Sequence, residues 1–111
     1  MTVTVKNKVP AKTVENTQTT QYTAVGVTTI FDKFTATNYS AAAATISVNL
    51  VTVTGSAGNN NLITKTKTLQ PAEVYTFPEL VGPVLNPGDF ISTIAGTASS
   101  INMRVSGREV T

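Results

Sequence analysis

The feature that most constrains this chain is its content of threonine and valine, which recur along almost all of the 111 residues. Both side chains are branched at Cβ, and this branching restricts χ1 and favours strands over helices. Glycine and proline recur at short intervals in the second half of the chain, a spacing typical of short strands in a sandwich or barrel. The sequence therefore predicts one all-β domain with a single core.

The alternation of apolar and polar residues predicts seven to eight strands and no stable helix. The clearest strand is 45–54, where the apolar positions change face near Leu50, through a bulge or through burial on both faces. The other expected strands are 21–24, 29–38, 62–69, 74–77, 90–95 and 101–106. Two antiparallel sheets packed face to face, as a jelly-roll or immunoglobulin-like sandwich, are the expected architecture.

Three local patterns add detail to this expectation. Within 29–38, strict alternation places Phe31 on the face opposite to Phe34. Pro87 and Gly88 suit the central positions of a type II turn. The Gly- and Asn-rich segment 55–61 is expected to form a flexible hairpin tip.

The first 20 residues are polar and have no strong period after Val5. Pro10 cannot donate to a central ladder, so this segment is compatible with an edge strand. It is equally compatible with an extended arm that a partner orders. We therefore divide the chain into an N-terminal arm or edge strand at 1–20 and a β-sandwich domain at 21–111.

The residue types that most enzymes depend on are missing. The chain contains no histidine and no cysteine, which removes the commonest general base and the usual soft metal ligands. Neither a Ser-x-x-Lys motif nor a phosphate-binding loop occurs. Glu73 and Asp89 follow prolines in turns and are expected to be solvated there. The sequence predicts no enzymatic activity, no cofactor and no metal site.

Charge is sparse, with 13% charged residues and a formal net charge of +2, whereas an ordinary domain has about 25%. Nucleic acid is not an expected partner, because it requires a clustered basic face. A nucleic-acid contact through Phe31 and Lys33 is less favoured than packing of Phe31 in a subunit contact or in the core. No apolar run is long enough for a membrane span, and no signal peptide is visible. The weakly charged surface favours packing against copies or partners.

Four segments follow one another in order from Ile30 to the end of the chain: 30–38 (IFDKFTATN), 69–75 (LQPAEVY), 79–91 (ELVGPVLNPGDFI) and 105–109 (VSGRE). In these segments the sequence is similar to small virion accessory proteins of tailed bacteriophages. The resemblance covers roughly three-quarters of the chain and is one of pattern, without a catalytic signature. It implies a compact β-sandwich that cements or decorates a capsid, or lines a collar or neck.

The leading hypothesis is a structural virion protein, made in the host cytoplasm, that cements or decorates a capsid by binding across capsomers. Its expected partners are the major capsid protein or other virion proteins, and further copies of itself. A collar, neck or tail accessory protein and a carbohydrate-binding module are the alternatives, although no Trp is present to form a sugar platform. The residues expected at the interface are Thr2, Val3, Val5, Val9, Pro10, Val14, Phe31, Val51 and Val53.

Overall fold

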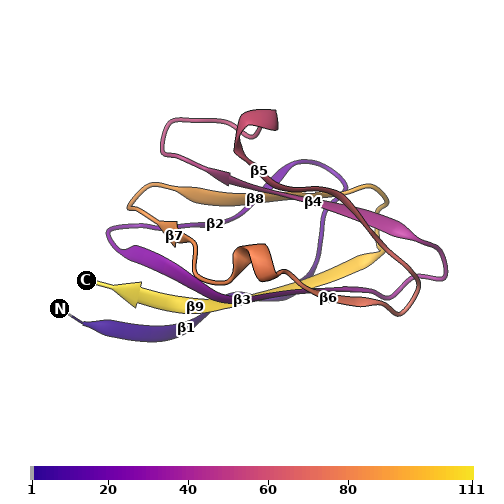
Figure 1. The fold of residues 1–111 in the computed structure, drawn as a ribbon, viewed down its shortest axis with the longest axis horizontal. Coiled ribbons are helices and arrows are strands. Elements are labelled where there is room, and N and C mark those ends of the chain that lie inside the picture. The colour runs from indigo at the N-terminus through magenta and orange to yellow at the C-terminus, as the bar shows by residue number, and fades with distance from the viewer. Residues whose placement is uncertain (1) are drawn as a thin grey trace.

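The computed structural model describes residues 2–111 and confirms the predicted fold class, with 58% of the residues in strands and 5% in helix. Two antiparallel sheets pack against each other (Figure 1). One sheet has the order β1-β9-β3-β6, with β7 also paired to β3, and the other has the order β2-β8-β4-β5. This part of the chain contains nine strands rather than seven to eight, because the short β7 has no alternation to mark it.

The elements follow one another along the chain with two short 3-10 helices between strands. The five-stranded sheet contains β1 (Val3–Thr13), β3 (Thr28–Asn38), β6 (Val74–Thr76), β7 (Val84–Leu85) and β9 (Ile101–Val110). The four-stranded sheet contains β2 (Thr19–Thr23), β4 (Ala44–Val51), β5 (Leu62–Leu69) and β8 (Phe90–Ala95). The helices are η1 (Asn59–Asn61) and η2 (Pro78–Leu80).

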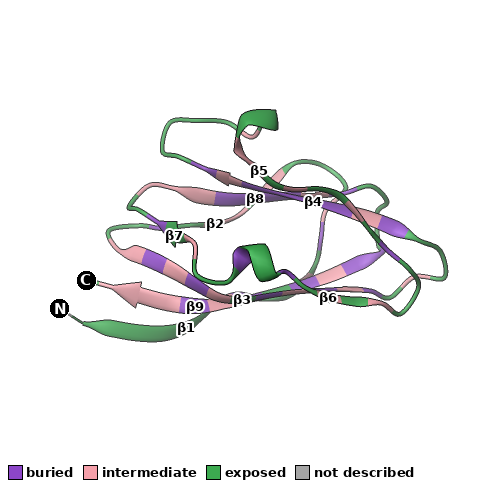
Figure 2. Ribbon diagram, viewed as in Figure 1, coloured by how far each residue is buried: buried purple, intermediate pink, exposed green. Residues whose placement is uncertain are grey.

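The core fills the space between the two sheets and has an aromatic centre. Phe34 and Phe77 are at most 1% exposed, and their ring centroids lie 4.5 Å apart. Tyr75 meets the edge of Phe77 at the same centroid distance of 4.5 Å. Buried residues alternate with partly exposed ones along β3 and β9 (Figure 2), as expected for sheets with one covered face.

A β-bulge in β3 overturns the predicted alternation. Phe31 and Asp32 together lie opposite the single residue Gly107 of β9, so the phase of the strand shifts by one residue. Both Phe31 and Phe34 consequently point into the core, at 0% and 1% exposure. A Cβ at Gly107 would lie 2.5 Å from the Ile30 carbonyl oxygen, so only glycine allows β9 to approach β3 this closely. The prediction that Phe31 faces the second side of the sheet is therefore wrong.

Residues 3–13 form β1, an edge strand that pairs with β9 along its length. Register shifts after Asn7 and after Val9 interrupt this pairing and turn the consecutive Lys8 and Val9 toward the interior. Val9 is 3% exposed, and Val14, just beyond the strand, is 0% exposed. The segment thus contributes side chains to the core, which an arm ordered only by a partner would not do.

Segment 55–61 is folded back rather than extended as a free hairpin tip. The Asn49 amide nitrogen donates to the Gly58 carbonyl at 2.9 Å and to Asn61 Oδ1 at 2.7 Å. The loop thereby covers part of the outer side of β4, where Ser47 and Asn49 are buried although they face away from the core. Burial on both faces, together with register shifts between β4 and β5, explains the mixed pattern of this strand.

Carboxylates accept hydrogen bonds from backbone amides in two of the turns. The Asp89 amide donates to the Asn86 carbonyl at 2.9 Å, and Gly88 has φ +94°, as predicted for a type II turn. Asp89 also accepts hydrogen bonds from the amides of Asn86 at 3.1 Å and Val53 at 3.0 Å. Glu73 accepts one from the Gln70 amide at 2.7 Å. Both carboxylates therefore hold turn geometry instead of serving only as solvated residues.

Asn38, the last residue of β3, is a buried polar residue that links three segments at this end of the sandwich. Its side chain is fully buried, and its amide nitrogen donates to the carbonyls of Ala42 and Leu69, both at 2.9 Å. Its side-chain oxygen Oδ1 accepts hydrogen bonds from the Ser40 backbone amide at 2.9 Å and from the Ser40 hydroxyl at 2.7 Å. One side chain thus joins β3, the following turn and the end of β5.

Replacing Asn38 with alanine is expected to destabilise the fold by about 2–3 kcal/mol, because buried carbonyl and amide groups lose their partners. Urea unfolding followed by circular dichroism measures the change. Asn16→Ala, at an exposed position, is the matched control and is expected to change stability by less than about 0.5 kcal/mol. Equal midpoints for the two variants would contradict this role of Asn38.

Ala72 occupies a strained position in the turn before β6. Its φ is +67°, which costs a residue with a Cβ about 1–2 kcal/mol. Ala72→Gly is therefore expected to stabilise the protein by about 0.5–1 kcal/mol, after the entropy of glycine in the unfolded chain is subtracted. The control is Ala43→Gly, at an exposed position without positive φ, where no gain is expected. A lower melting temperature for Ala72→Gly than for the parent protein would contradict the strain argument.

Candidate interaction surface

The described residues contain no metal-binding cluster and no membrane-spanning helix. Within 2–111, no cluster of three or more Asp, Glu, His or Cys side chains could hold a metal ion, and every buried side-chain nitrogen or oxygen has a hydrogen-bond partner. No helix of this part of the chain has the length and apolar character to cross a membrane. A hollow beside Asn49 and Lys65 has a volume of about 170 Å³, which is smaller than the 300–1,000 Å³ typical of ligand pockets.

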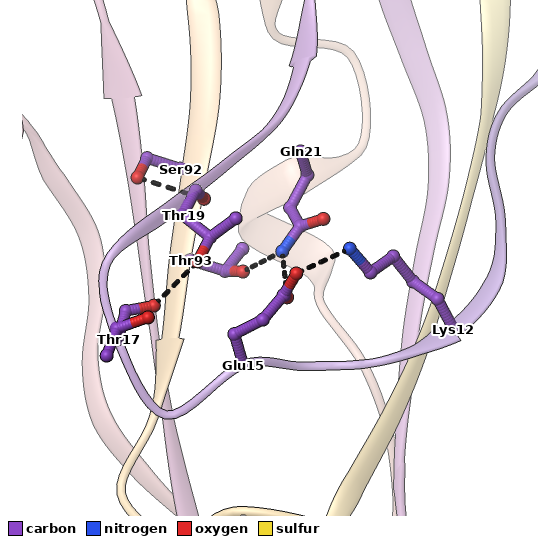
Figure 3. A network of polar contacts seen from close by, with 7 residues as sticks. All are labelled: Lys12, Glu15, Thr17, Thr19, Gln21, Ser92 and Thr93. Atoms are coloured by element: carbon purple, nitrogen blue, oxygen red, sulfur yellow. Dashed lines mark hydrogen bonds and ion pairs between the residues drawn. The ribbon is translucent and has the colours of Figure 1, made fainter.

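One network of hydrogen bonds stabilises the segment that connects β1 in one sheet to β2 in the other (Figure 3). Glu15 accepts hydrogen bonds from Lys12 Nζ at 2.8 Å and from Gln21 Nε2 at 2.9 Å. Gln21 Nε2 also donates to Thr93 Oγ1 of β8 at 2.9 Å. The hydrogen bond from Lys12 holds the pKa of Glu15 below its usual value. Each group in this network serves another protein group, so the network is structural.

A second network closes the end of the sandwich where the two termini meet. Lys8, whose side chain is 3% exposed, forms an ion pair with Glu109 of β9, and Lys6 Nζ lies 3.0 Å from the same carboxylate. Lys8 Nζ also lies 5.0 Å from the ring centroid of Tyr22 in β2, and the Tyr22 hydroxyl is 2.7 Å from that of Thr29. The network therefore joins β1, β2, β3 and β9. The hydrogen bonds from Lys8 and Lys6 lower the pKa of Glu109.

The outer faces of the two sheets differ. The four-stranded sheet is partly covered by its own loop, since Asn49 bonds to Gly58 and Asn61. The five-stranded sheet has no such cover among the described residues, and the first half of β1 is exposed along its whole length (Figure 2). The outer face of the five-stranded sheet is therefore the face that no loop of the described residues covers in this way.

The strand register assembles an apolar group on this outer face. Val5 lies opposite Arg108, Arg108 opposite Ile30, and Ile30 opposite Val84, and directly paired side chains share a face. The neighbouring row pairs Val3 with Val110. We call the group the terminal patch; its residues are Val3, Val5, Ile30, Val84 and Val110. Three of these side chains are widely exposed, with Val3 at 51%, Val5 at 74% and Val84 at 51%.

Two basic residues lie farther along the same face, with Lys33 in the row next to the terminal patch and Arg104 in the row after that. Lys33 and Arg104 are exposed and share the outer face with it, since their paired partners Ser106 and Thr35 point away from the core. Arg108 lies inside the patch, with Nη2 3.0 Å from an Asp32 carboxylate oxygen, so its charge is balanced. The outer face thus combines the exposed valines of the terminal patch with two positive charges farther along β3 and β9.

The predicted interface residues divide into two groups. Thr2, Val3, Val5, Pro10 and Val53 are exposed, and the first three lie together at the start of β1. The remaining ones are buried: Val9 at 3%, Val14 at 0% and Phe31 at 0% exposure in the core, and Val51 at 1% exposure on the outer side of β4, beside Gly55. For these four residues the prediction is wrong. The bulges turn Val9 and Phe31 inward, Val14 packs into the core, and the loop after β4 covers Val51.

Other residues of the surface were not identified from the sequence. Ile30, Val84 and Val110 join the terminal patch only through strand pairing, and nothing in a single sequence marks β7 as a neighbour of β3. Arg104 carried a usable signal, because the alternation in 101–106 places it opposite to Met103 and Val105. Its position on the outer face agrees with that alternation.

Comparison with known proteins assigns no relative. No protein-family model matches the sequence, and neither the search of curated proteins nor the search of solved structures found a match. The similarity to phage virion accessory proteins therefore stays a prediction from the sequence.

The ion pairs predict how stability depends on pH. The folded-state pKa values of Glu15 and Glu109 lie below the ordinary value of 4.5, so both carboxylates add stability above that pH. This contribution is lost as the pH falls through the folded pKa values. No histidine is present to titrate at neutral pH. We expect a nearly constant urea midpoint between about pH 5.5 and 7.5, and a decline below about pH 4.5.

Glu109→Gln tests the source of the acid decline. The variant is expected to have a lower midpoint at pH 7, because the buried Lys8 ammonium loses its charged partner, and a shallower decline toward pH 3. Lys6→Gln, which removes the exposed member of the same ion pairs, is expected to have the smaller effect at pH 7. An acid decline as steep in Glu109→Gln as in the parent protein would refute the assignment.

Proposed function

We propose that this protein is a structural subunit that binds a larger particle through the outer face of its five-stranded sheet and performs no chemistry. The observation that carries the proposal is the difference between the two outer faces. One is partly covered by the loop that bonds to Asn49, whereas the other leaves the terminal patch exposed. A patch of exposed valines with a polar border is characteristic of protein interaction sites.

The particle that we propose is the virion of a tailed bacteriophage, with this protein as a cement or decoration subunit that bridges capsomers. The sequence similarity from Ile30 onward supports this setting, and the compact sandwich suits a part that is added to a shell. The major capsid protein would be the partner of the outer face, and the protein would be made in the host cytoplasm. A subunit of a collar or neck would use the same surface in a ring.

Burial of the terminal patch against the particle contributes to the free energy of binding. Fully burying one exposed valine contributes about 1.5–3 kcal/mol before the costs of association are subtracted. Lys33 and Arg104 add selectivity, because a partner without acidic groups would leave their charges uncompensated.

Sedimentation of particles tests the proposal. Particles from cultures that produce the protein are separated on a density gradient, and each fraction is probed with an antibody to the chain and by mass spectrometry. We expect the protein in the fractions that contain the major capsid protein. Recovery of the protein only at the top of the gradient, with none in the particle fractions, would contradict the proposal.

Charge reversal identifies the surface that binds. Purified Arg104→Glu is expected to occupy particles that lack the protein at least about tenfold more weakly than the parent protein, which corresponds to a loss of about 1.4 kcal/mol or more. Lys65→Glu makes the same charge change at an exposed position on the edge of the other sheet and is expected to bind normally. Equal binding of Arg104→Glu and the parent protein would place the interface elsewhere.

A further inference from the structure

The open edge of β1 carries regular, unpaired backbone groups next to the terminal patch. Thr2 and Thr111 exchange two hydrogen bonds, of 3.1 and 3.0 Å. In an antiparallel pair, hydrogen-bonded positions alternate with positions whose amide and carbonyl point the other way. Thr4 and Lys6 therefore bond to β9, whereas the amides and carbonyls of Val3, Val5 and Asn7 point away from the sheet. Among residues 2–111, no strand pairs with this edge.

Strand edges are commonly protected by bulges, prolines, charged residues or short length, and the other edges of this sandwich show such protection. The edge strands β6 and β7 have only three and two residues. Strand β2 has a register shift between Thr20 and Tyr22, and β5 carries Lys65, Lys67 and a positive φ at Thr66. These edges are poorly suited to pairing with another strand.

Protection of β1 is confined to its second half. The register shifts follow Asn7 and Val9, and Pro10 comes next. The stretch from Val3 to Asn7 is regular, and the ammonium group of Lys6 within it is drawn toward Glu109 at 3.0 Å. A flat edge with exposed valines is therefore left at the start of the chain.

We propose that two copies of this protein associate through the first half of β1, as antiparallel neighbours related by a two-fold axis at Val5. This inference rests on the proposed function. It adds to that function a second copy of the chain as the partner of the β1 edge. The regular stretch 3–7 is centred on Val5, so this register uses all of it. Val5 then pairs with Val5 of the second copy, and Val3 pairs with Asn7 of the second copy.

Charge supports a second copy in this register. Lys6 stands opposite Thr4 of the second copy, so no two lysines face each other across the new ladder. Thr4 is in turn paired with Glu109 in its own sheet, which brings the exposed Lys6 side chain of each copy toward a carboxylate of the other. A two-fold axis at Asn7 would instead bring the bulge at Lys8 into the ladder and interrupt the pairing.

The dimer would join the two five-stranded sheets edge to edge and leave their outer faces free. The terminal patches of the two copies would meet at Val5 and form one continuous apolar surface. A dimer of this kind presents paired surfaces to a particle, which suits a subunit that bridges neighbouring capsomers.

Single cysteines test the register, because the natural chain has none. In a hydrogen-bonded antiparallel pair, directly opposite Cα atoms lie about 5.5 Å apart, within the range that a disulfide spans. Val5→Cys is therefore expected to form a covalent dimer under mild oxidation at micromolar concentration. Val3→Cys would lie about 13 Å from its own copy and is expected to stay monomeric on a non-reducing gel. An equimolar mixture of Val3→Cys and Asn7→Cys is expected to yield the mixed dimer.

Light scattering supplies an independent readout. The parent protein is expected to show a dimer mass that dissociates on dilution, and Val5→Lys is expected to be monomeric at the same concentrations. Val25→Lys makes the same change at a valine that is 79% exposed in a turn and is expected to remain dimeric. Circular dichroism confirms that each variant is folded.

The outcomes separate this inference from the proposed function. A monomer at all concentrations, or a dimer that Val5→Lys leaves intact, overturns pairing through β1. If such a protein still sediments with particles, the structural role stands without the dimer. A dimer that depends on Val5 but never occurs in particle fractions supports the inference and refutes the proposed particle.

Discussion

Strand β9 is the element on which the rest of the structure depends, because it pairs with β1 on one side and with β3 on the other. Its close approach to β3 requires glycine at position 107, where a Cβ would meet the Ile30 carbonyl at 2.5 Å. The bulge opposite Gly107 turns Phe31 into the core. The ion pair from Lys8 to Glu109 then fixes β1 on the other side. A chain without disulfides is thus held by ladder pairing, a packed interior and one partly buried ion pair.

The same arrangement decides which surface is left free. Because the bulges of β1 and β3 turn Val9 and Phe31 inward, the sandwich buries them without any partner. The residues that remain outside, such as Val3 and Val5, are those that lie before the bulges, where the strand is regular and its edge is open. The loop that bonds to Asn49 covers part of the outer face of the opposite sheet. The proposed interface is therefore a consequence of where the fold places its irregularities.

The sequence was sufficient to predict the fold class, the type II turn at Pro87 and Gly88, and the outward position of Arg104, because each depends on local pattern or turn chemistry. It was insufficient for the bulge at Phe31 and Asp32, since a bulge depends on which residue of the partner strand lies opposite. The burial of Asn38 and Asn49 was missed for a related reason. Each amide is buried by partners distant in sequence, such as Leu69 and Gly58, which no local pattern reveals.

Residue-resolved hydrogen exchange by NMR tests the central claim most directly, namely that the first half of β1 is an edge open to a partner. The amides of Thr4 and Lys6 bond to β9 and should be protected at every protein concentration. The amides of Val3, Val5 and Asn7 should exchange rapidly in dilute protein and become protected as concentration rises. Rapid exchange of these three amides at all concentrations, and equally in the presence of particles, would contradict the claim.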